Sequence, residues 1–440
     1  MKLVLAILAF LAVSATSIAE ELETWELDNP RIHSRRIDGV QKRFSVRTVE
    51  RRDGGLFLNG RRVEVKAADW PADAASCGVE LTDRVIKRAV IALKTKGYNV
   101  LRPAGAPAEA VAWCEKVGLL VEDWPTADRI PAAEIVKPVP PEKDCRPRSV
   151  AKDRVANIHL SHVHRGGGRL ERPDNTLETF LWCWGNGSAL ECDCRKTSDG
   201  VPIMLHDDNL ARVGRGISEE FAAKSVSREL TWADIADVDV GSYLSSEYAS
   251  ERITRMDTVM SAMAGHPKWL LFVDEKGAGP QTIAASASRF GVLDQVYYTG
   301  SSVAKAVEWT KETGGGKTLV WIGGWPWNHS AAETARTEAH FRKVLGEIAA
   351  AGWSKNVTAV SIHTYYDPDW PEPFVPSTEF IRTFVAELKA HGIHVYSIPF
   401  EGGETEEVYY RLFELGCDGF STDYPSVMFK VIKDLKECAR

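Results

Sequence analysis

The sequence lacks the features of several common protein classes. Its eight cysteines include no Cys-x-x-Cys pair, so zinc-site spacing is absent, and they are too few to build a fold of 440 residues on disulfides. A formal charge of −7 and the absence of a block of Lys and Arg argue against a nucleic-acid partner. After the N-terminus, no apolar run reaches the roughly 20 residues that cross a bilayer, so we expect no stable membrane insertion.

The N-terminus itself does contain an apolar run. Lys2 precedes the apolar stretch 3–13, and Ser17-Ile18-Ala19 offers small residues at cleavage positions. We interpret residues 1–19 as a signal peptide and expect export to the periplasm or the extracellular space, where some cysteines could pair. An uncleaved N-terminal anchor is the alternative, and the shortness of the run disfavours it.

A proline-rich segment divides the remaining chain. Residues 130–147 carry five prolines with no helical or strand period, and we predict a linker over 130–150. Before it, short strand-like runs alternate with two helical stretches, 82–96 and 108–116, each followed closely by a glycine. We therefore predict a small α/β accessory unit at 20–129 and a larger unit at 151–440.

The larger unit alternates strand-length apolar runs with amphipathic helical stretches. This pattern predicts a parallel sheet covered by helices, and the length suits a closed (β/α)8-type barrel. An open doubly wound sheet is the alternative, but its glycine-rich phosphate loop is missing. The expected strands are 158–160, 191–195, 201–205, 270–273, 296–298, 319–322, 357–362, 394–398 and 419–421, and the clearest helices are 302–311, 335–351, 380–390 and 404–414.

Acidic residues lie where a barrel enzyme carries its chemistry, at the carboxyl ends of strands. Glu191 and Asp193 alternate with cysteines along one strand, so both carboxylates point to the same face. Two inward carboxylates repel unless a cation lies between them, and their oxygens suit Mg²⁺ or Ca²⁺. Two surface acids on an edge strand are the alternative, although the flanking Leu190 favours a buried strand.

Two further segments add ionisable residues to this region. The turn Ser198-Asp199-Gly200 predicts a hairpin that returns His206 opposite the two carboxylates. Asp274 and Lys276 share a face at the end of strand 270–273, where an acid can complete a metal site and a lysine can bind an anionic substrate. A salt-bridged rim is the alternative for this pair.

Together these residues resemble the motifs of the glycerophosphodiester phosphodiesterase family. The match is dense over 159–212 and thinner over 213–440. It comprises, in order, His164-Arg165-Gly166, Arg172-Pro173-Asp174-Asn175-Thr176 with Phe180, Glu191-x-Asp193, Thr197-x-Asp199-Gly200, His206-Asp207, Leu210-x-Arg212, Glu251-Arg252-Ile253, Asp274-x-Lys276 and Thr422-Asp423-Tyr424-Pro425.

The resemblance implies a fold, a cofactor and a set of residue roles. It implies an irregular TIM-type barrel that hydrolyses phosphodiesters with a bound divalent cation, Mg²⁺ or Ca²⁺. Carried over by position, the metal ligands would be Glu191, Asp193 and Asp274. The acid–base pair would be His164 and His206, and the phosphate would be bound by Arg165 and Lys276.

The chain departs from the family pattern at several positions. The family usually has Glu where Asp174 and Asp274 stand, and at 274 the shorter side chain could shift the ion or admit a water ligand. Where the family often has Trp-Thr-x-Asn, this chain has Tyr396-Ser397-Ile398-Pro399. The groups that hold the alcohol part of the substrate are therefore expected to differ.

The accessory unit has a second, weaker resemblance. Residues 54–125 resemble the opening of the catalytic barrel in beta-galactosidase-like glycoside hydrolases, through "GLFLNGRRVEVKAADWP", "LKTKGYNVLRPAGAP" and "WCEKVGLLVEDWP". The later strands that would carry a glycosidase's two carboxylates are absent, so we interpret the unit as non-catalytic. A residual glycan contact through Trp70 and Trp124 is a further hypothesis, with buried aromatic packing as the alternative.

The leading functional hypothesis is an enzyme that acts on a small-molecule phosphodiester. It would hydrolyse glycerophosphodiesters to an alcohol and sn-glycerol 3-phosphate. Lysophospholipids or inositol phosphodiesters are alternative substrates, and a non-catalytic phosphoester- or glycan-binding protein is the alternative class. The presence of both histidines, all three acids and both cations favours an enzyme.

Overall fold

The computed structural model describes residues 22–37, 40–71, 73–74, 77–140, 144–168, 171–324, 326–399 and 404–439. The proposed signal peptide, residues 1–19, lies outside these ranges. The chain divides into two compact units, with the boundary between Lys137 and Pro138. This boundary falls within the segment 130–150 that the sequence predicts as a linker.

One part of the linker prediction is wrong. Ala132–Ile135 forms a short helix, α3, in which Ala132 and Ile135 are both buried. The helix contacts α1 (Asp83–Thr95) and belongs to the first unit. A single turn between prolines contains too few residues to give a helical period, which is why the sequence pattern does not reveal it.

The first unit is a small α/β structure, as predicted. An antiparallel sheet β3-β4-β5 precedes a parallel sheet β6-β7-β8, whose strands are connected by α1 and α2. Buried apolar residues, with Trp25, Leu56 and Leu120 among them, form its core. The strands are β1 (His33–Ile37), β2 (Val40–Phe44), β3 (Val49–Arg52), β4 (Gly55–Leu58), β5 (Arg61–Val63), β6 (Ala67–Asp69), β7 (Val100–Arg102) and β8 (Leu120–Val121), and α2 is Ala108–Val117.

The two tryptophans proposed for glycan contact differ in environment. Trp70 is only 3% exposed, so the packing alternative applies to it. Trp124 packs beside the core of the first unit, and the Arg51 guanidinium lies 5.5 Å from its ring centroid. A glycan contact through this unit stays a prediction and would have to rest on Trp124.

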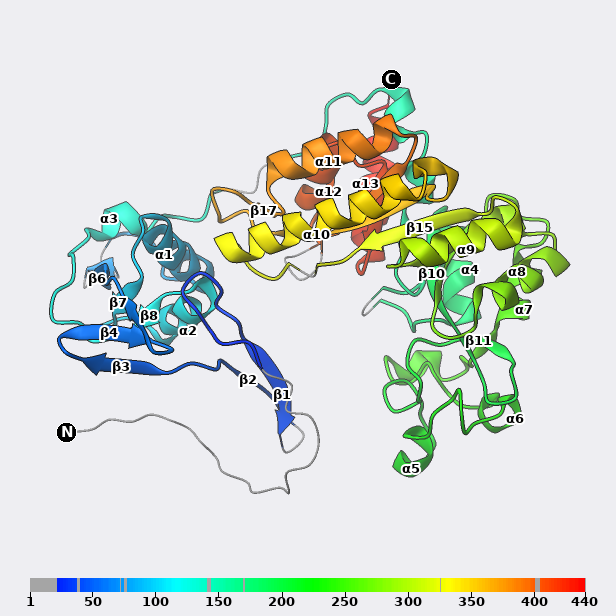
Figure 1. Ribbon diagram of the computed structural model, residues 1–440, viewed down its shortest axis with the longest axis horizontal. Coiled ribbons are helices and arrows are strands. Elements are labelled where there is room, and N and C mark those ends of the chain that lie inside the picture. The colour runs from blue at the N-terminus through cyan, green and yellow to red at the C-terminus, as the bar shows by residue number, and fades with distance from the viewer. Residues whose placement is uncertain are drawn as a thin grey trace. The chain divides into compact units, whose positions relative to one another are not determined.

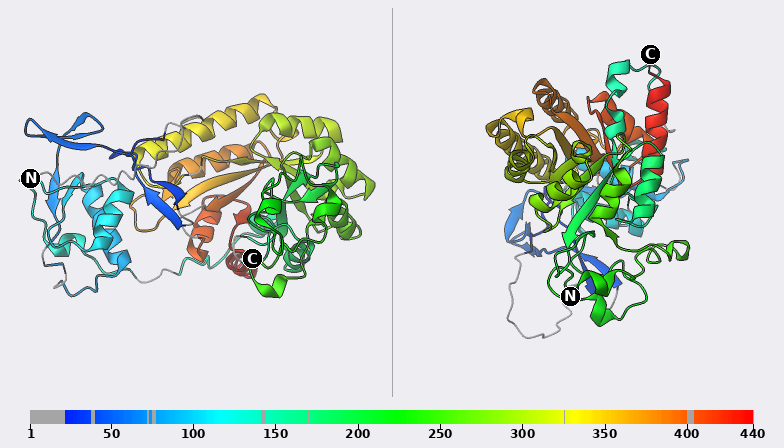
Figure 2. Two further views of the ribbon diagram at one scale, coloured as in Figure 1. Left: turned by 90° about the horizontal axis from the view of Figure 1, so that it is seen from below. Right: turned by 90° about the vertical axis from the view of Figure 1, so that its right-hand side faces the viewer.

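The second unit is a closed barrel of eight parallel strands, which confirms the predicted fold and excludes the open sheet. The strand order is β9-β10-β13-β14-β15-β16-β18-β19, and β19 pairs with β9 to close the barrel. Helices lie outside the strands (Figures 1 and 2). The barrel strands are β9 (His162–Val163), β10 (Ala189–Lys196), β13 (Leu271–Glu275), β14 (Val296–Gly300), β15 (Lys317–Ile322), β16 (Ala359–Tyr366), β18 (His394–Pro399) and β19 (Gly419–Thr422).

The remaining elements decorate this barrel. Strands β11 (Pro202–Met204), β12 (Thr254–Arg255) and β17 (Phe374–Val375) add to it in antiparallel pairings. The helices are α4 (Leu177–Gly185), α5 (Glu219–Ala222), α6 (Trp232–Ile235), α7 (Met256–Met263), α8 (Pro280–Arg289), α9 (Val303–Thr313), α10 (Ala331–Ala350), α11 (Thr378–Ala390), α12 (Glu406–Glu414) and α13 (Pro425–Glu437).

The first expected strand is displaced along the chain. Ile158–Leu160 forms a 3₁₀ turn, and the first barrel strand is β9, which begins at His162. Ile158 and Leu160 are both buried, but in different clusters, Leu160 among the residues that fill the barrel. A short apolar run is compatible with a strand or a buried turn, so its pattern alone does not separate the two.

Packing inside the barrel determines where a ligand can enter. Leu160, Ala189, Phe272, Leu319 and Tyr396 are buried in one cluster, and Leu319 also lines the cavity described below. A second set of apolar residues packs between the strands and the helices. The carboxyl ends of the strands are therefore left for polar side chains.

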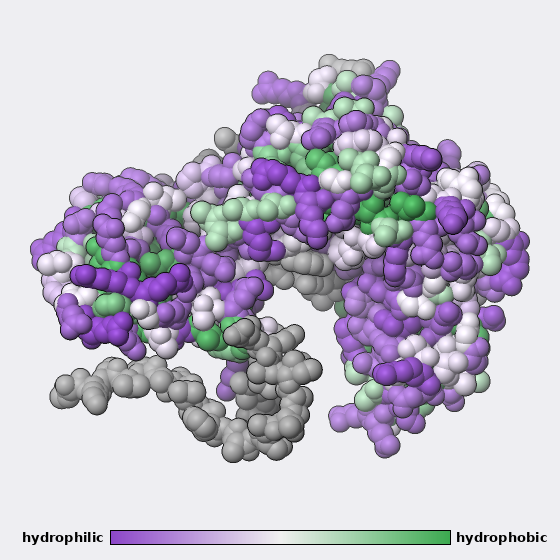
Figure 3. All heavy atoms as spheres, viewed as in Figure 1, coloured by the Kyte–Doolittle hydropathy of each residue, from purple (hydrophilic) through white to green (hydrophobic). Residues whose placement is uncertain are grey.

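The described part of the chain contains no helix that could span a membrane. No helix there is both long and apolar enough to cross a bilayer. On the face drawn in Figure 3, hydrophilic residues predominate and apolar residues occur in small groups. All eight cysteines are unpaired and five of them are buried, so no disulfide is seen.

Candidate active site

A cavity of about 510 Å³ opens at the carboxyl ends of the barrel strands. All seven residues singled out from the sequence line it: His164, Arg165, Glu191, Asp193, His206, Asp274 and Lys276. They come from three adjacent barrel strands and the hairpin strand β11, or from the residues that follow these strands. The structure therefore brings together every site residue that the sequence predicts.

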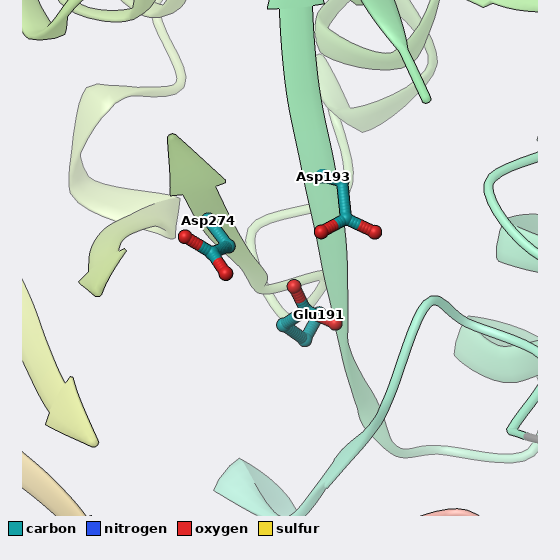
Figure 4. A group of neighbouring side chains, drawn as sticks. All are labelled: Glu191, Asp193 and Asp274. Carbon is teal, nitrogen blue, oxygen red and sulfur yellow. The ribbon is translucent and has the colours of Figure 1, made fainter. Parts of the chain in front are cut away.

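Strand register produces the acidic cluster. In the parallel pair β10–β13, Asp193 stands beside Asp274, and Glu191 precedes Asp193 by one inward position. Figure 4 shows the three carboxylates pointing toward one another. One oxygen from each lies within 4.8 Å of the others, and within the described chain this is the one such group of three potential metal ligands.

The burial of these carboxylates fits a hard divalent cation. Asp193 is 1% exposed and Glu191 is 7% exposed. Burial, with Asp193 adding to it, raises the pKa of Glu191 to about 8, so ionising all three acids is unfavourable without a compensating positive charge. Three converging carboxylates that leave room for water are a donor set that Mg²⁺ or Ca²⁺ accepts.

The loop that carries Arg165 is held in an unusual backbone conformation. Arg165 and Asn175 both have positive φ, 52° and 61°. The Arg165 N–H donates to Glu191 Oε2 at 2.8 Å, and the Asn175 side chain donates to Asp193 Oδ2 and accepts from the Asp193 N–H, both at 2.9 Å. Left-handed backbone costs a non-glycine residue roughly 1–2 kcal/mol, and here it aims these two residues at the acidic cluster.

Two glycines of the same loop allow close backbone contact. A Cβ on Gly167 would overlap the carbonyl oxygen of Arg172, and a Cβ on Gly168 would overlap that of Asp423. Gly167 therefore allows the loop to approach the backbone at Arg172, and Gly168 allows it to pack against the segment after β19. This packing places His164 beside Asp423.

His164 forms a histidine–carboxylate pair with Asp423. Its Nδ1 lies 2.7 Å from Asp423 Oδ1, and because a carboxylate only accepts, Nδ1 carries the proton and Nε2 is left for a ligand. Burial disfavours the charged imidazolium, but the hydrogen bond that His164 donates to Asp423 and the charge of Glu191 outweigh this effect and raise the pKa of His164. The backbone N–H of Asp423 in turn donates to the Glu404 carboxylate at 2.9 Å, and this bond helps to hold Asp423 in place.

His206 forms a matching pair with its neighbour in sequence. Its Nδ1 lies 2.8 Å from Asp207 Oδ1. The hydrogen bond from His206, and then the hydrogen bond and the charge of Arg212, lower the pKa of Asp207 in spite of partial burial. The cavity is thus flanked by two histidines, each held through Nδ1 by a carboxylate.

The side chains of Arg165 and Lys276 differ in how firmly they are paired. Lys276 Nζ lies 2.7 Å from Asp274 Oδ2 and 3.6 Å from Asp193 Oδ1, so it sits against the acidic cluster. The Arg165 guanidinium has only long contacts: a terminal nitrogen lies 3.4 Å from Asp174, and Nε lies 3.5 Å from Asp193, too far for a hydrogen bond within the described structure. Arg165 therefore has donors available for an incoming anion.

The cavity wall farther around the barrel is uncharged. It contains Leu319, Trp321, His363 and Ile398, from β15, β16 and β18. The rings of Trp321 and His363 are nearly parallel, with centroids 5.6 Å apart, and burial lowers the pKa of His363 to about 3, so it is neutral. This wall can contact an apolar or uncharged group next to a bound phosphate.

Several residues of the site have no role predicted from the sequence. Asn175, Asp207, Arg212 and Asp423 belong to the quoted motifs, so their presence in those motifs was the available signal. Tyr243, Trp321 and His363 belong to none, and neither their spacing nor their neighbours in sequence point to the cavity.

The sequence of this chain is similar to those of known proteins. A sequence model described as the glycerophosphoryl diester phosphodiesterase family matches residues 164–427, more than half of the chain. Glycerophosphodiester phosphodiesterase 1 of Mus musculus is 28% identical over 149 residues, covering 33% of this chain and 41% of the relative. The chain thus spans less than half the length of that mammalian relative. A glycerophosphodiester phosphodiesterase of Caldanaerobacter subterraneus is 22% identical over 277 residues, covering 62% of this chain and 96% of the relative.

Solved structures of such proteins also match. A glycerophosphodiester phosphodiesterase from Agrobacterium tumefaciens is 16% identical, with a TM-score of 0.46, over 62% of this chain and 99% of its own. An Oleispira antarctica phosphodiesterase in complex with the product sn-glycerol-3-phosphate is 18% identical, with a TM-score of 0.45, over 64% of this chain and 99% of its own.

Proposed function

Because the chain belongs to the glycerophosphoryl diester phosphodiesterase family, we propose that it hydrolyses glycerophosphodiesters to an alcohol and sn-glycerol 3-phosphate. We propose that the reaction depends on Mg²⁺ or Ca²⁺ bound by Glu191, Asp193 and Asp274. The observation that carries the proposal is one cavity in which three converging carboxylates, Arg165, Lys276 and two carboxylate-held histidines meet.

The charged residues have complementary parts in this proposal. A divalent cation at the carboxylates would neutralise negative charge on the phosphate and polarise its oxygen. Arg165, whose contacts to Asp174 and Asp193 are long, and Lys276 bind the remaining phosphate oxygens and stabilise the charge that develops in the transition state. The placement of Lys276 against Asp274 and Asp193 keeps its ammonium at the edge of the metal site.

The histidines move the protons. One imidazole Nε2 takes a proton from the attacking water while a new P–O bond forms, and the other gives a proton to the alkoxide as the old P–O bond breaks. Asp423 and Asp207 hold the two rings in the Nδ1–H tautomer and stabilise the imidazolium. The sum is addition of water across one P–O bond, with no change in net proton count on the enzyme.

A substrate panel tests the proposal. Glycerophosphocholine, glycerophosphoinositol and a lysophospholipid are assayed with Mg²⁺ or Ca²⁺ added, and the released alcohol and glycerol 3-phosphate are quantified. We expect metal-stimulated turnover of at least one glycerophosphodiester. Binding of these compounds without turnover would instead favour the non-catalytic phosphoester-binding alternative.

Lysophospholipids are a second candidate substrate class. The uncharged wall of Leu319, Trp321 and Ile398 favours them, because it offers apolar contact to a group beyond the phosphate. If lysophospholipids are the better substrates, a Trp321→Ala variant should lose turnover on them more than on glycerophosphocholine.

We also propose roles for the rest of the chain. Residues 1–19 would direct export to the periplasm or the extracellular space, as the Lys2 start and the apolar run 3–13 indicate. Residues 20–129 would be a non-catalytic accessory unit, because every proposed catalytic side chain lies in the second unit. Fractionation of cells and N-terminal sequencing of the mature protein test the first of these.

A further inference from the structure

Arg212 reaches the site from the insertion between β11 and β12. Its Nε donates to Asp207 Oδ2 at 2.6 Å, and its two terminal nitrogens donate to the two oxygens of Asp174 at 3.2 and 2.8 Å. The other oxygen of Asp207 is the one that holds His206 Nδ1. A continuous chain of hydrogen bonds therefore runs from Asp174 through Arg212 and Asp207 to His206.

All three nitrogens of the Arg212 guanidinium are used by carboxylates. Asp174, which is 8% exposed, also accepts from the Tyr243 hydroxyl and lies 3.4 Å from Arg165. The planar guanidinium is therefore clamped on one side by a buried, fixed carboxylate. Arg165, whose contacts are long, is available for a phosphate, whereas Arg212 would have to break charge-assisted hydrogen bonds to bind one.

We propose that Arg212 is a positioning residue for His206. Its Nε fixes the Asp207 carboxylate, and Asp207 then fixes the His206 ring in the Nδ1–H tautomer with Nε2 directed to the substrate. Asp207 follows β11 in an irregular segment, so without Arg212 its carboxylate can rotate away from the imidazole. The kinetic part of this inference rests on the proposed function, and the hydrogen-bond chain itself does not.

A double-mutant cycle separates positioning from general stability. Arg212→Met should lower kcat on glycerophosphocholine by about 10–100-fold, the usual range for a residue that orients a functional side chain, with little change in KM. In a His206→Ala background the same substitution should lower kcat by about two-fold or less, because the residue that it positions is gone. Arg212→Lys should show most of the decrease in kcat that Arg212→Met shows, since one ammonium cannot form the planar fork.

Arg215→Met is the matched control. Arg215 lies in the same insertion, with its guanidinium 5.9 Å from the Tyr243 ring centroid, but it donates to the backbone carbonyls of Arg212 and Gly214. We expect near-normal kcat from this variant. Equal losses from Arg212→Met in both backgrounds, or an equal loss from Arg215→Met, would overturn the inference.

The tautomer of His206 can be measured by spectroscopy, independently of enzyme turnover. In ¹⁵N NMR of the imidazoles, with His206 assigned by its absence from His206→Ala, the wild type and Arg215→Met should show one Nδ1–H tautomer. Arg212→Met and Arg212→Lys should show a mixture. An unchanged tautomer in both Arg212 variants would refute positioning even if the chain hydrolyses no glycerophosphodiester, and a mixture would support it in the same case.

Discussion

Among single residues, the two histidines carry the most specific chemical expectation. Each is held through Nδ1 by a carboxylate, His164 by Asp423 and His206 by Asp207, so geometry alone does not distinguish the acid from the base. The leaving group does distinguish them, because an alkoxide needs a proton and a nitrophenolate hardly does.

We expect alanine at either histidine to lower kcat on glycerophosphocholine by about 10²–10⁴-fold. The histidine that acts as the acid should lose far less activity on a nitrophenyl phosphodiester, whereas its partner should lose similar amounts on both substrates. Parallel steady-state assays of both variants check this. Equal losses on both substrates for both variants would mean that the histidines orient the phosphate or the metal instead of moving protons.

At the scale of elements, the loop 164–168 after β9 connects the acidic cluster to the last strand. Gly168→Ala should destabilise the protein by about 1–3 kcal/mol and lower activity, because its Cβ would overlap the Asp423 carbonyl and displace the partner of His164. Gly187→Ala is the matched control: it has a similar positive φ, 73°, but no atom within 4 Å of its Cβ. Chemical denaturation and kinetics of both variants check the prediction.

Backbone strain should cost both glycine variants a similar amount of stability. Only Gly168→Ala should also lose activity, because only its Cβ displaces Asp423. If the two variants behave alike, the close approach of the loop to Asp423 does not matter for the site.

The elements also show how far a sequence can predict this molecule. The barrel was predictable from its alternating pattern, and Glu191, Asp193, Asp274 and Lys276 were predictable because they follow the two-residue period of regular strands. His206 followed from the hairpin turn, whereas His164 and Arg165 were named only through the family resemblance. Asp207, Arg212 and Tyr243 received no role because they lie in loops of the segment 205–255, whose helices and strand are too short to give a period. Trp321 and His363 lie on strands whose apolar sequence is typical of buried core strands. Only the structure of the closed barrel shows that these two residues face the cavity.

At the scale of the whole molecule, the separation into two units gives a direct expectation. A chain beginning at Pro138 should fold and keep near-normal kcat, since every proposed catalytic side chain lies after that boundary. It also retains Arg146, which pairs with Asp434 and Glu437 of the barrel unit. Circular dichroism and the glycerophosphocholine assay check this. A folded but inactive truncated chain would show that residues 20–137 contribute to the site.

The acidic cluster should make the metal-free protein less stable as the pH rises. In the folded, metal-free chain, burial raises the pKa of Glu191 to about 8, above its ordinary value of 4.5. The retained proton stabilises the fold fully below pH 4.5, and this contribution is lost as the pH rises through about 8. The Tm of chelator-treated protein should therefore fall between about pH 5 and pH 8.

Added Mg²⁺ or Ca²⁺ should raise the Tm more at the upper end of this range, because the carboxylates must be ionised to bind it. Chelator-treated Glu191→Gln is the control, and its Tm should depend less on pH over the same interval. Thermal unfolding curves of both proteins check the sign. A Tm that rises with pH in the chelated wild type would show that these carboxylates are not held together as described.

Metal dependence of hydrolysis tests the central claim most directly. The full chain is treated with a chelator, dialysed, and assayed for release of glycerol 3-phosphate from glycerophosphocholine before and after addition of Mg²⁺ or Ca²⁺, beside Asp193→Ala. We predict that chelation abolishes turnover and that one of the two ions restores it. Asp193→Ala should stay at least about 10²-fold below the restored wild type, with weaker ion binding and an intact fold. Turnover that survives complete chelation, or an Asp193→Ala variant with wild-type activity and ion affinity, would contradict the account.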